Sequence, residues 1–430
     1  MTSDRREEAR EAFVWIWLPG AVEPVVAGRI ARQGDLLVFN YGQSYLARPE
    51  RMPIYLPELP LRAGAIVPEA PLEVAGCLRD GSPDAWGRRV IVNRLTGLAG
   101  DAAGAIELDE LTFMLDSGSD RAGALDFQAS PSVYVPRDQV GATLEDLLEA
   151  AARVDRGERI PPMLDRALFH GSSIGGARPK ALIEQDTRKF IAKFSSTNDT
   201  YAVVKAEFVA MRLAHLAGLD VAPVELVAVG GKDVLLVERF DRASTPGGWT
   251  RRAMVSALTI FGLGEMQAHY ASYSELADIV RARFTSPRST LRELFGRMAF
   301  NVLTGNNDDH ARNHAAFWDG EMLSLTPAYD ICPQARGGRE TNQAIFIVGG
   351  DRRSLLETCR SAAPRFQLGD GEARDVIEGQ IDCIRREWRG VCDEAALSEV
   401  DRAFLWRRQF LNDYAFEGYP GGTPAEPEKP

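Results

Sequence analysis

The chain has 430 residues, of which 50 are Lys or Arg and 61 are Asp or Glu, and its formal net charge is −11. Hydrophobic residues make up 45% and charged residues 26%, which excludes a mainly disordered, collagen-like or coiled-coil protein and predicts about two or three globular domains. The acidic balance argues against a broad surface for sequence-independent DNA binding, but leaves room for a local basic patch or a DNA-binding partner.

The N-terminal segment and the cysteines indicate the cellular compartment of the protein. The apolar run at residues 13–18 is far too short to span a bilayer, and the charged start lacks the order of a signal peptide. The 5 cysteines have no CxxC spacing, which argues against a disulfide framework or a zinc site. We therefore expect a cytoplasmic protein.

The first part of the chain is predicted to form a β-meander. Short apolar stretches between residues 14 and 47 are rich in β-branched and aromatic residues and are separated by glycine-containing turns. Helical periodicity follows over residues 85–95 and 108–116. Residues 120–128 are expected to return to the sheet as a strand, and the linker composition at 131–136 indicates the end of a domain.

The middle of the chain predicts a small sheet with one helix on it. Residues 143–154 form an amphipathic pattern with Thr143 as the N-cap. Residues 172–241 then give strand, strand, helix, strand and strand, with Gly218 ending the helix and Gly230-Gly231 joining the last two strands as a hairpin.

From about Arg252 the pattern becomes mainly helical. We expect helices over the segments 253–259, 273–284, 291–303, 372–389 and 397–416. A polar interruption at 306–313 precedes a short hairpin whose turn is Asp319-Gly320. The predicted division is an N-terminal subdomain (12–135), a small lobe (136–245), a helical lobe (246–416) and a disordered Pro/Gly-rich tail (417–430).

The polar segment 306–313, between an apolar helix and an apolar strand, is the strongest chemical signal. Phosphoryl transfer needs an aspartate to orient the accepting hydroxyl, and oxygen ligands that hold Mg²⁺ against the ATP phosphates. Asp308 and Asn313 have the separation found in the kinase catalytic loop HRDxxxxN, and Asp330 follows where a second metal carboxylate belongs. The alternative is a polar loop whose side chains cap helices.

The preceding half of the chain contains the other parts of a nucleotide site in order. The glycine-rich turn 171–177 can bring backbone N–H groups to phosphate oxygens, although most such turns are ordinary. Lys193 is a lone cation in an apolar strand, and Glu207 in the next helix can pair with it, unless both are solvated. The backbone of residues 237–240 can form hydrogen bonds with the edge of an adenine ring. The alternative is an ordinary edge strand that leaves the sheet. The order of these parts favours a kinase-like site.

Taken together, these segments resemble the HipA-type Ser/Thr kinases, the toxin components of HipA–HipB toxin–antitoxin modules. The resemblance rests on the segments SSIGGARPKALI, FIAKF, LLVERFDR, NNDDHARNHAAFW and LTPAYDI in order, and on SPDAWGRR and DRAGALDF nearer the N-terminus. It covers about residues 14–416. It implies an α+β, bilobal protein-kinase-like fold with a β-rich N-terminal subdomain and a mainly helical C-lobe.

The resemblance also implies roles for individual residues. Asp308 would be the catalytic base, Asn313 and Asp330 the Mg²⁺ ligands, and Lys193 the lysine on the ATP phosphates. Residues 175–180 would form the phosphate loop and 238–240 the adenine hinge. His310 would help to shape the site, unless it is a packing residue. The other implied ATP-site residues are Ser173, Ile174, Gly175, Gly176, Ala177, Arg178, Pro179, Lys180, Glu207, Glu238, Arg239, Phe240, Ala311, Arg312 and Tyr329.

Ser173 matches the family's autophosphorylated serine, and Ser172 is the alternative acceptor. A phosphate there would repel the ATP phosphates and draw the loop outward, so we expect autophosphorylation to lower activity. Two features depart from the family pattern. Arg178-Pro179 stands within the loop where GAQEK is common, adding a cation and stiffening the backbone. Asp309 stands where glycine is common, which adds negative charge near the metal and can alter substrate choice.

The function implied is an ATP- and Mg²⁺-dependent protein Ser/Thr kinase that acts as a growth-inhibiting toxin. Its implied targets are aminoacyl-tRNA synthetases, and its implied partner is a small helix-turn-helix antitoxin of the HipB kind that makes most contacts to operator DNA. Two alternatives stay open. A small-molecule kinase fits the same residues equally well. A non-catalytic pseudo-kinase acting as a co-repressor is disfavoured because Lys193, Asp308, Asn313 and Asp330 are all present.

Overall fold

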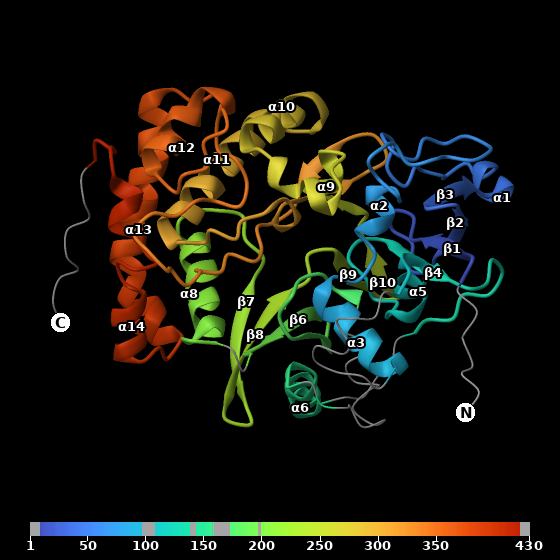
Figure 1. Cartoon of the computed structure of the whole chain (residues 1–430), viewed down its shortest axis with the longest axis horizontal. Coiled ribbons are helices and arrows are strands. Elements are labelled where there is room, and N and C mark those ends of the chain that lie inside the picture. Colours follow the sequence, from blue (N-terminus) through green and yellow to red (C-terminus); the bar gives the residue numbers. More distant parts are fainter. Residues whose placement is uncertain are drawn as a thin grey trace.

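The computed structural model describes residues 9–96, 108–137, 143–156, 158, 173–196 and 199–421. The N-terminal strands lie at one end of the molecule, and the long C-terminal helices lie at the other (Figure 1). The sheet that contains β6, β7 and β8 lies between them, with α8 beside it (Figure 1). Side chains pack together across the predicted domain boundaries, so the division into an N-terminal subdomain, a small lobe and a helical lobe stays a prediction.

The N-terminal region forms the predicted antiparallel sheet, in the order β3-β2-β1-β4. Residues 120–128 do return to it, since β4 pairs with β1. Alternate side chains such as Val14 and Phe127 are fully buried beneath it. Its strands are β1 (Glu11–Ile16), β2 (Val25–Gln33), β3 (Leu36–Tyr41) and β4 (Leu125–Gln128), and its helices are α1 (Gln43–Leu46), α2 (Gly76–Arg79), α3 (Ala85–Thr96) and α5 (Glu110–Asp116).

The second sheet has the predicted order of elements along the chain, with α8 (Val203–Leu216) between its two hairpins. Gly230 and Gly231 form the turn of the second hairpin with φ of 54° and 77°, in the left-handed region that glycine adopts without strain. The sheet order is β5-β6-β8-β7, with β5 (Lys180–Gln185), β6 (Arg188–Phe194), β7 (Val224–Val229) and β8 (Lys232–Glu238).

The two faces of this sheet have different partners. Because side chains alternate along a strand, Leu235 and Val237 of β8 face the core that contains α8, and Val234 and Leu236 face a second core. That second core is formed by α6 (Leu144–Asp155) and by Trp86 and other residues of α3. Thr143 caps α6 as predicted, accepting a bond from the Asp146 N–H. The N-terminal subdomain therefore completes the core of the small lobe.

The helix predicted over residues 253–259 was wrong. The chain first makes a hairpin of β9 (Arg242–Thr245) and β10 (Gly248–Arg251), then the strand β11 (Met254–Ser256), and only one turn of helix, α9 (Ala257–Ile260). β11 pairs with β12 (Ala315–Trp318), which pairs with β13 (Leu323–Leu325). Pairing with a strand distant in the sequence outweighed the local helical pattern.

The remainder is helical, as expected, and α11 is its centre. α11 ends at Gly305, whose φ of 66° turns the chain into the polar segment. The helix predicted over 397–416 is interrupted, because Arg407 and Leu411 adopt positive φ. The helices are η2 (Glu265–Tyr270), α10 (Tyr273–Arg283), α11 (Pro287–Thr304), η3 (Ala311–Asn313), α12 (Leu356–Ala362), η4 (Ala363–Phe366), α13 (Asp370–Glu394), α14 (Glu399–Leu405) and η5 (Asp413–Phe416).

These elements confirm an α+β architecture with a sheet-containing small lobe, a helical large lobe and a β-rich N-terminal subdomain. Part of the predicted disordered tail, residues 422–430, lies outside the described residues. Within the described part of the chain, no helix is both long and apolar enough to cross a bilayer.

Candidate active site

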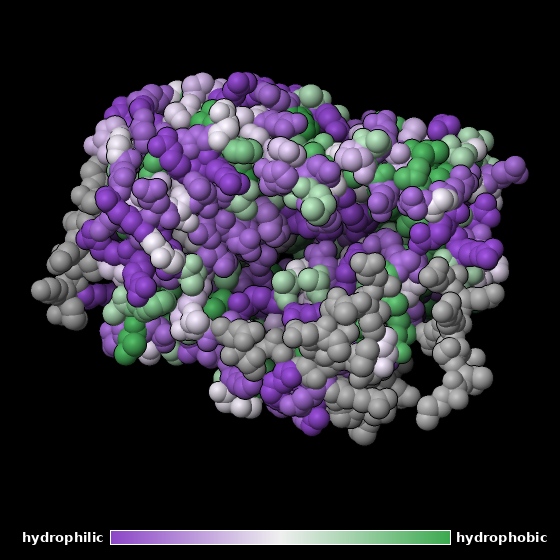
Figure 2. Space-filling view, in the orientation of Figure 1, coloured by the Kyte–Doolittle hydropathy of each residue, from purple (hydrophilic) through white to green (hydrophobic). Residues whose placement is uncertain are grey.

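A cavity of about 400 Å³ lies where the two lobes and the N-terminal subdomain meet. The face shown in Figure 2 is hollowed near its centre, and hydrophilic residues border the hollow. The predicted site residues that line the cavity are Ile174, Gly175, Gly176, Ala177, Arg178, Lys180, Lys193, Glu238, Arg239, Phe240, Asp308, His310, Arg312, Asn313, Tyr329 and Asp330. Ser173, Pro179, Glu207 and Ala311 are not in its wall, and Ser172 lies outside the described residues.

Two lysines from adjacent strands face this cavity. Lys180 of β5 is directly opposite Lys193 of β6, an arrangement in which like charges repel. The Lys193 Nζ lies 2.5 Å from Glu207 Oε1 and also forms an ion pair with Asp330, so the pair predicted with Glu207 is formed. Lys180 donates a hydrogen bond to the carbonyl of Gly175.

The pKa values of both lysines follow from this crowding. Burial opposes the charge of Lys193, but Asp330 and Glu207 outweigh burial and raise its pKa. Burial, and then the charge of Lys193, lower the pKa of Lys180 to about 8. An anion between the two ammonium groups would relieve their repulsion, so this wall of the cavity suits phosphate.

The glycine-rich turn lies against these lysines. Gly176 has a φ of 105°, a backbone conformation that residues with a side chain rarely adopt, and a Cβ there would also crowd the end of the Lys180 side chain. Arg178, the unusual cation of this loop, is neutralised by Asp199 through contacts of 2.5 and 2.6 Å. Ser173 is buried, and its Oγ donates to the carbonyl of Asp120 at 3.3 Å.

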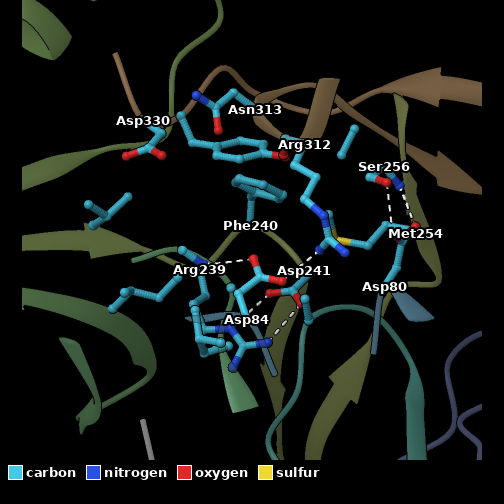
Figure 3. Close-up of a pocket in the computed structure, with 18 of the residues that line it drawn as sticks. Asp80, Asp84, Arg239, Phe240, Asp241, Met254, Ser256, Arg312, Asn313 and Asp330 are labelled. Atoms are coloured by element: carbon cyan, nitrogen blue, oxygen red, sulfur yellow. Dashed lines mark hydrogen bonds and ion pairs between the residues drawn. The ribbon is translucent and has the colours of Figure 1, made fainter. Parts of the chain in front are cut away.

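Asp330 and Asn313 present oxygen atoms on one side of the cavity, close to each other in Figure 3. Asn313 donates its amide N–H to the Asp308 carbonyl at 3.2 Å, which leaves its side-chain oxygen for a cation. Asp330 has a left-handed φ of 60°, and its side chain is 40% exposed. Burial opposes its ionisation, but Lys193 and Lys180 outweigh burial and lower the pKa of Asp330.

These donors fit a magnesium ion shared with a nucleotide. Magnesium prefers oxygen ligands and is commonly held by one or two protein groups together with substrate phosphates. Asn313 and Asp330 lie in the wall of the same cavity as the two lysines, so both kinds of contact are available in one place. Among the described residues, no group of three or more His, Cys, Asp or Glu side chains is arranged to hold a metal.

Asp308 is exposed at the edge of the cavity. Partial loss of solvent raises the pKa of its carboxyl, His310 opposes that shift, and the charge of Asp330 adds to it. A carboxyl with a raised pKa is a stronger base once ionised, as proton abstraction from a hydroxyl requires.

Asp309, the aspartate that stands where glycine is common in the family, lies beside Tyr273 and His314. Its carboxylate is buried and accepts hydrogen bonds from Tyr273 and from His314 Nε2, the latter at 2.9 Å. It is not in the cavity wall. These two partners hold its carboxylate behind the loop, yet its charge still reaches the site, since it helps to raise the pKa of Asp308. An effect of Asp309 on the metal or on substrate choice stays a prediction.

The segment predicted to be the adenine hinge, residues 238–240, presents an aromatic ring to the cavity. The N–H groups of Glu238 and Arg239 donate to the carbonyls of Pro223 and Lys189, at 2.9 and 2.8 Å. Phe240 projects into the cavity beside Tyr329, with ring centroids 5.7 Å apart (Figure 3). A flat ring can therefore be held by stacking at this wall.

Some residues of the site could not be recognised from the sequence. Asp84 and Asp80 of the N-terminal subdomain line the cavity. Asp80 accepts hydrogen bonds from the backbone and hydroxyl of Ser256, both at 2.7 Å (Figure 3). The segment SPDAWGRR contributed to the family resemblance, but an aspartate before a helix ordinarily predicts only an N-cap.

Comparison with known proteins gives this site a family. A model of the HipA-like C-terminal domain matches residues 172–388, and a model of the HipA N-terminal domain matches residues 19–128. The chain belongs to the HipA family. The resemblance and the α+β kinase-like fold stated from its motifs are therefore confirmed.

Individual relatives match in part. The chain is similar to the serine/threonine-protein kinase toxin HipA of Shewanella oneidensis, with 27% identity over 241 residues, which covers 50% of this chain and 54% of that protein. A putative kinase of Sinorhizobium fredii is 31% identical over 150 residues, 33% of each chain. The matched regions thus span about half and a third of these relatives.

Similarity of structure covers more of the chain than these sequence matches do. A solved complex of Shewanella oneidensis HipA with HipB and operator DNA contains a chain similar to this one, with a TM-score of 0.65 and 18% identity. That likeness covers 93% of this chain and 95% of the HipA chain. It shows that the HipA fold includes the N-terminal subdomain and both lobes.

Proposed function

We propose that this chain is an ATP- and Mg²⁺-dependent Ser/Thr kinase that acts as the toxin of a toxin–antitoxin module. The observation that carries the proposal is the convergence of Lys193, Asp308, Asn313 and Asp330 on one cavity. These residues come from β6, from the loop after α11, from η3 and from the segment after β13. Membership of the HipA family and a relative named as a kinase toxin support it.

The residues divide the work of phosphoryl transfer. Lys180 and Lys193 would bind the nucleotide phosphates, and Glu207 would hold Lys193 in place. Asn313 and Asp330 would hold Mg²⁺, which neutralises charge on the transferred phosphoryl group when bound. Asp308 would orient the hydroxyl of the substrate and accept its proton. Phe240, which packs beside Tyr329, would stack against the adenine ring.

The proposed partners follow from the family. The solved Shewanella complex contains HipB and operator DNA, and we propose a HipB-like helix-turn-helix antitoxin for this chain. The net charge of −11 supports operator contacts made mainly by that antitoxin. We propose a translation component, an aminoacyl-tRNA synthetase, as the phosphorylated protein.

Autophosphorylation is proposed at Ser173, with Ser172 as the alternative. Ser173 is 2% exposed, so the loop must leave its observed position before that hydroxyl can accept a phosphoryl group. Preincubation with ATP should then inactivate the wild type faster than Ser173→Ala. Equal rates of inactivation would contradict the role of Ser173.

The catalytic proposal is tested with Asp308→Asn. Removal of a general base typically lowers a rate by about 10²- to 10⁴-fold, and we expect a loss in that range. Nucleotide affinity should change little, because the lysines and Asn313 remain. The measurement is transfer of labelled phosphate from ATP to purified synthetases, alongside a panel of metabolites.

A second substitution of the same residue, Asp308→Ala, tests the proposal in cells. Wild-type protein expressed without an antitoxin should stop growth, and Asp308→Ala should relieve that effect. If the variant stays toxic, the toxicity does not come from phosphoryl transfer. Labelling of a metabolite instead of a synthetase would favour the small-molecule kinase.

A further inference from the structure

The start of α3, in the N-terminal subdomain, lies against the glycine-rich turn of the small lobe. Trp86 donates its backbone N–H to the carbonyl of Gly176 at 3.1 Å and its indole N–H to the carbonyl of Lys180 at 3.0 Å. Arg89 donates to the carbonyl of Ala177 at 2.6 Å. The backbone of the turn is thus bonded to another subdomain.

Trp86 makes this contact rigid. Its side chain is fully buried in the core shared by α3, α6 and the second sheet. A buried aromatic side chain of this size cannot shift without leaving a cavity that its neighbours do not fill. The position of α3 therefore determines where the turn can lie.

Asp84 links the turn to the opposite lobe. Its Oδ2 accepts the Gly176 N–H at 2.8 Å, and its Oδ1 forms an ion pair with Arg312 Nη1 at 2.9 Å. Figure 3 shows Asp84 and Arg312 approaching each other across the cavity. Asp84 also lies close against the glycine-rich turn, since a Cβ on Gly175 would lie 2.6 Å from Asp84 Oδ2.

Arg312 is itself anchored in the large lobe. Its guanidinium group also pairs with Glu265 of η2, and its carbonyl accepts the Tyr329 hydroxyl at 2.7 Å. It directly precedes Asn313, the proposed metal ligand. One carboxylate from the N-terminal subdomain therefore contacts both the phosphate loop and the catalytic loop.

We propose that Asp84 is a positioning residue, which sets the distance between the glycine-rich turn and the catalytic loop through its two carboxylate oxygens. The inference rests on the proposed kinase function, since the purpose of that distance is to hold nucleotide phosphates against Asn313 and Asp330. It assigns the N-terminal subdomain a part in nucleotide binding that neither lobe supplies.

The test is Asp84→Asn, which keeps the shape of the side chain but removes its charge. Amide hydrogen exchange over residues 175–180 of the nucleotide-free protein should rise roughly 10- to 100-fold, as expected when one hydrogen bond to a charged group is lost. The KM for ATP should rise by a similar factor, while kcat changes less than threefold. If Asp84 only capped α3, the substitution would not specifically raise either the hydrogen exchange of residues 175–180 or the KM for ATP.

Two matched variants separate the effects. Arg94→Gln removes the ion pair with Asp116 at the far end of the same helix, where the charged groups are 2.9 Å apart, and it should leave loop exchange unchanged. Glu265→Gln removes the other acidic partner of Arg312 and should also leave loop exchange unchanged. Equal loop exchange in Asp84→Asn and Arg94→Gln would overturn the proposal.

The two measurements also distinguish the inference from the proposed function. Hydrogen exchange needs no activity, so faster loop exchange in Asp84→Asn would support the positioning role even if the wild type transferred no phosphate. If the wild type is active but Asp84→Asn keeps both its loop protection and its KM for ATP, the positioning role is wrong and the proposed kinase function is unaffected.

Discussion

The charge of Lys193 is buried, which is unfavourable unless acidic partners compensate it. Its ammonium group is mostly buried and lies between Glu207, which is 2% exposed, and Asp330. Removing one partner of a buried ion pair leaves an uncompensated charge, which is more damaging than replacing both partners. Stability and nucleotide binding can therefore be separated at this residue.

Lys193→Met should lower the free energy of unfolding by about 3–5 kcal/mol, because Glu207 loses its partner. The double variant Lys193→Met/Glu207→Met should recover most of that loss, since the unpaired carboxylate is also gone. Both variants should lose nucleotide affinity. Urea unfolding and binding of a fluorescent ATP analogue measure the two effects.

A double variant that bound nucleotide like the wild type would contradict the role of Lys193. A single variant as stable as the wild type would show that Glu207 is not left as an uncompensated charge when Lys193 is removed. Each outcome points to a different error in the account of this charge.

At the scale of elements, a buried ion cluster joins the hinge to the N-terminal subdomain. Arg239 contacts Asp120 at 3.0 Å and Asp241 at 2.8 Å, and Arg242 contacts the same two carboxylates, both at 2.9 Å. Both arginines also donate to the carbonyl of Arg121. The motifs DRAGALDF and LLVERFDR, which are far apart in the sequence, thus meet in one cluster.

This cluster predicts an acid-dependent stability. Burial opposes ionisation of Asp241, but Arg239 and Arg242 outweigh burial and lower its pKa to about 2. A carboxyl with a lowered pKa in the folded state stabilises the fold above its unfolded pKa of about 3.9, and that contribution disappears as the pH falls toward the folded pKa. The contribution of Asp241 is about 2–3 kcal/mol.

We expect the free energy of unfolding of the wild type to fall between about pH 4 and pH 2 more steeply than that of Asp241→Asn. The two proteins should therefore differ less in stability at pH 2.5 than at pH 6. Denaturant unfolding at a series of pH values gives the comparison. Parallel curves for the two proteins would contradict the proposed ionic origin of this stability.

At the scale of the whole molecule, one hydrophobic core runs through the N-terminal sheet and both lobes. It includes Val14 and Phe127 of the first sheet, Phe208 of α8 and Phe295 of α11. The second core adds Trp86 from the N-terminal subdomain to the sheet of the small lobe. Among the described residues, each large core cluster that includes residues of a lobe also includes residues of that subdomain.

A continuous core predicts that the three parts unfold together. Hydrogen exchange at increasing denaturant should show β1, β6 and α11 losing protection at one common midpoint. Loss of protection in β1 at a clearly lower denaturant concentration would show that the N-terminal subdomain is an independent unit.

The sequence was sufficient for features that neighbouring residues specify. Gly230-Gly231 predicted the hairpin, and Thr143 predicted its helix cap. The order of the polar segments predicted one site that includes Lys193, Asp308, Asn313 and Asp330, and these four residues line one cavity. Turn chemistry, capping and spacing act over a few residues, so they can be recognised without a structure. The roles given to those residues stay a proposal.

Only the tertiary structure decided which distant segments meet. Asp84 is 92 positions from Gly176 and 228 positions from Arg312, and no local pattern encodes those contacts. The same holds for β11, which became a strand because β12 was available, and for Asp309, whose carboxylate Tyr273 and His314 hold in the core. Packing between remote elements determined these outcomes, because burial and hydrogen bonding at a contact depend on both partners.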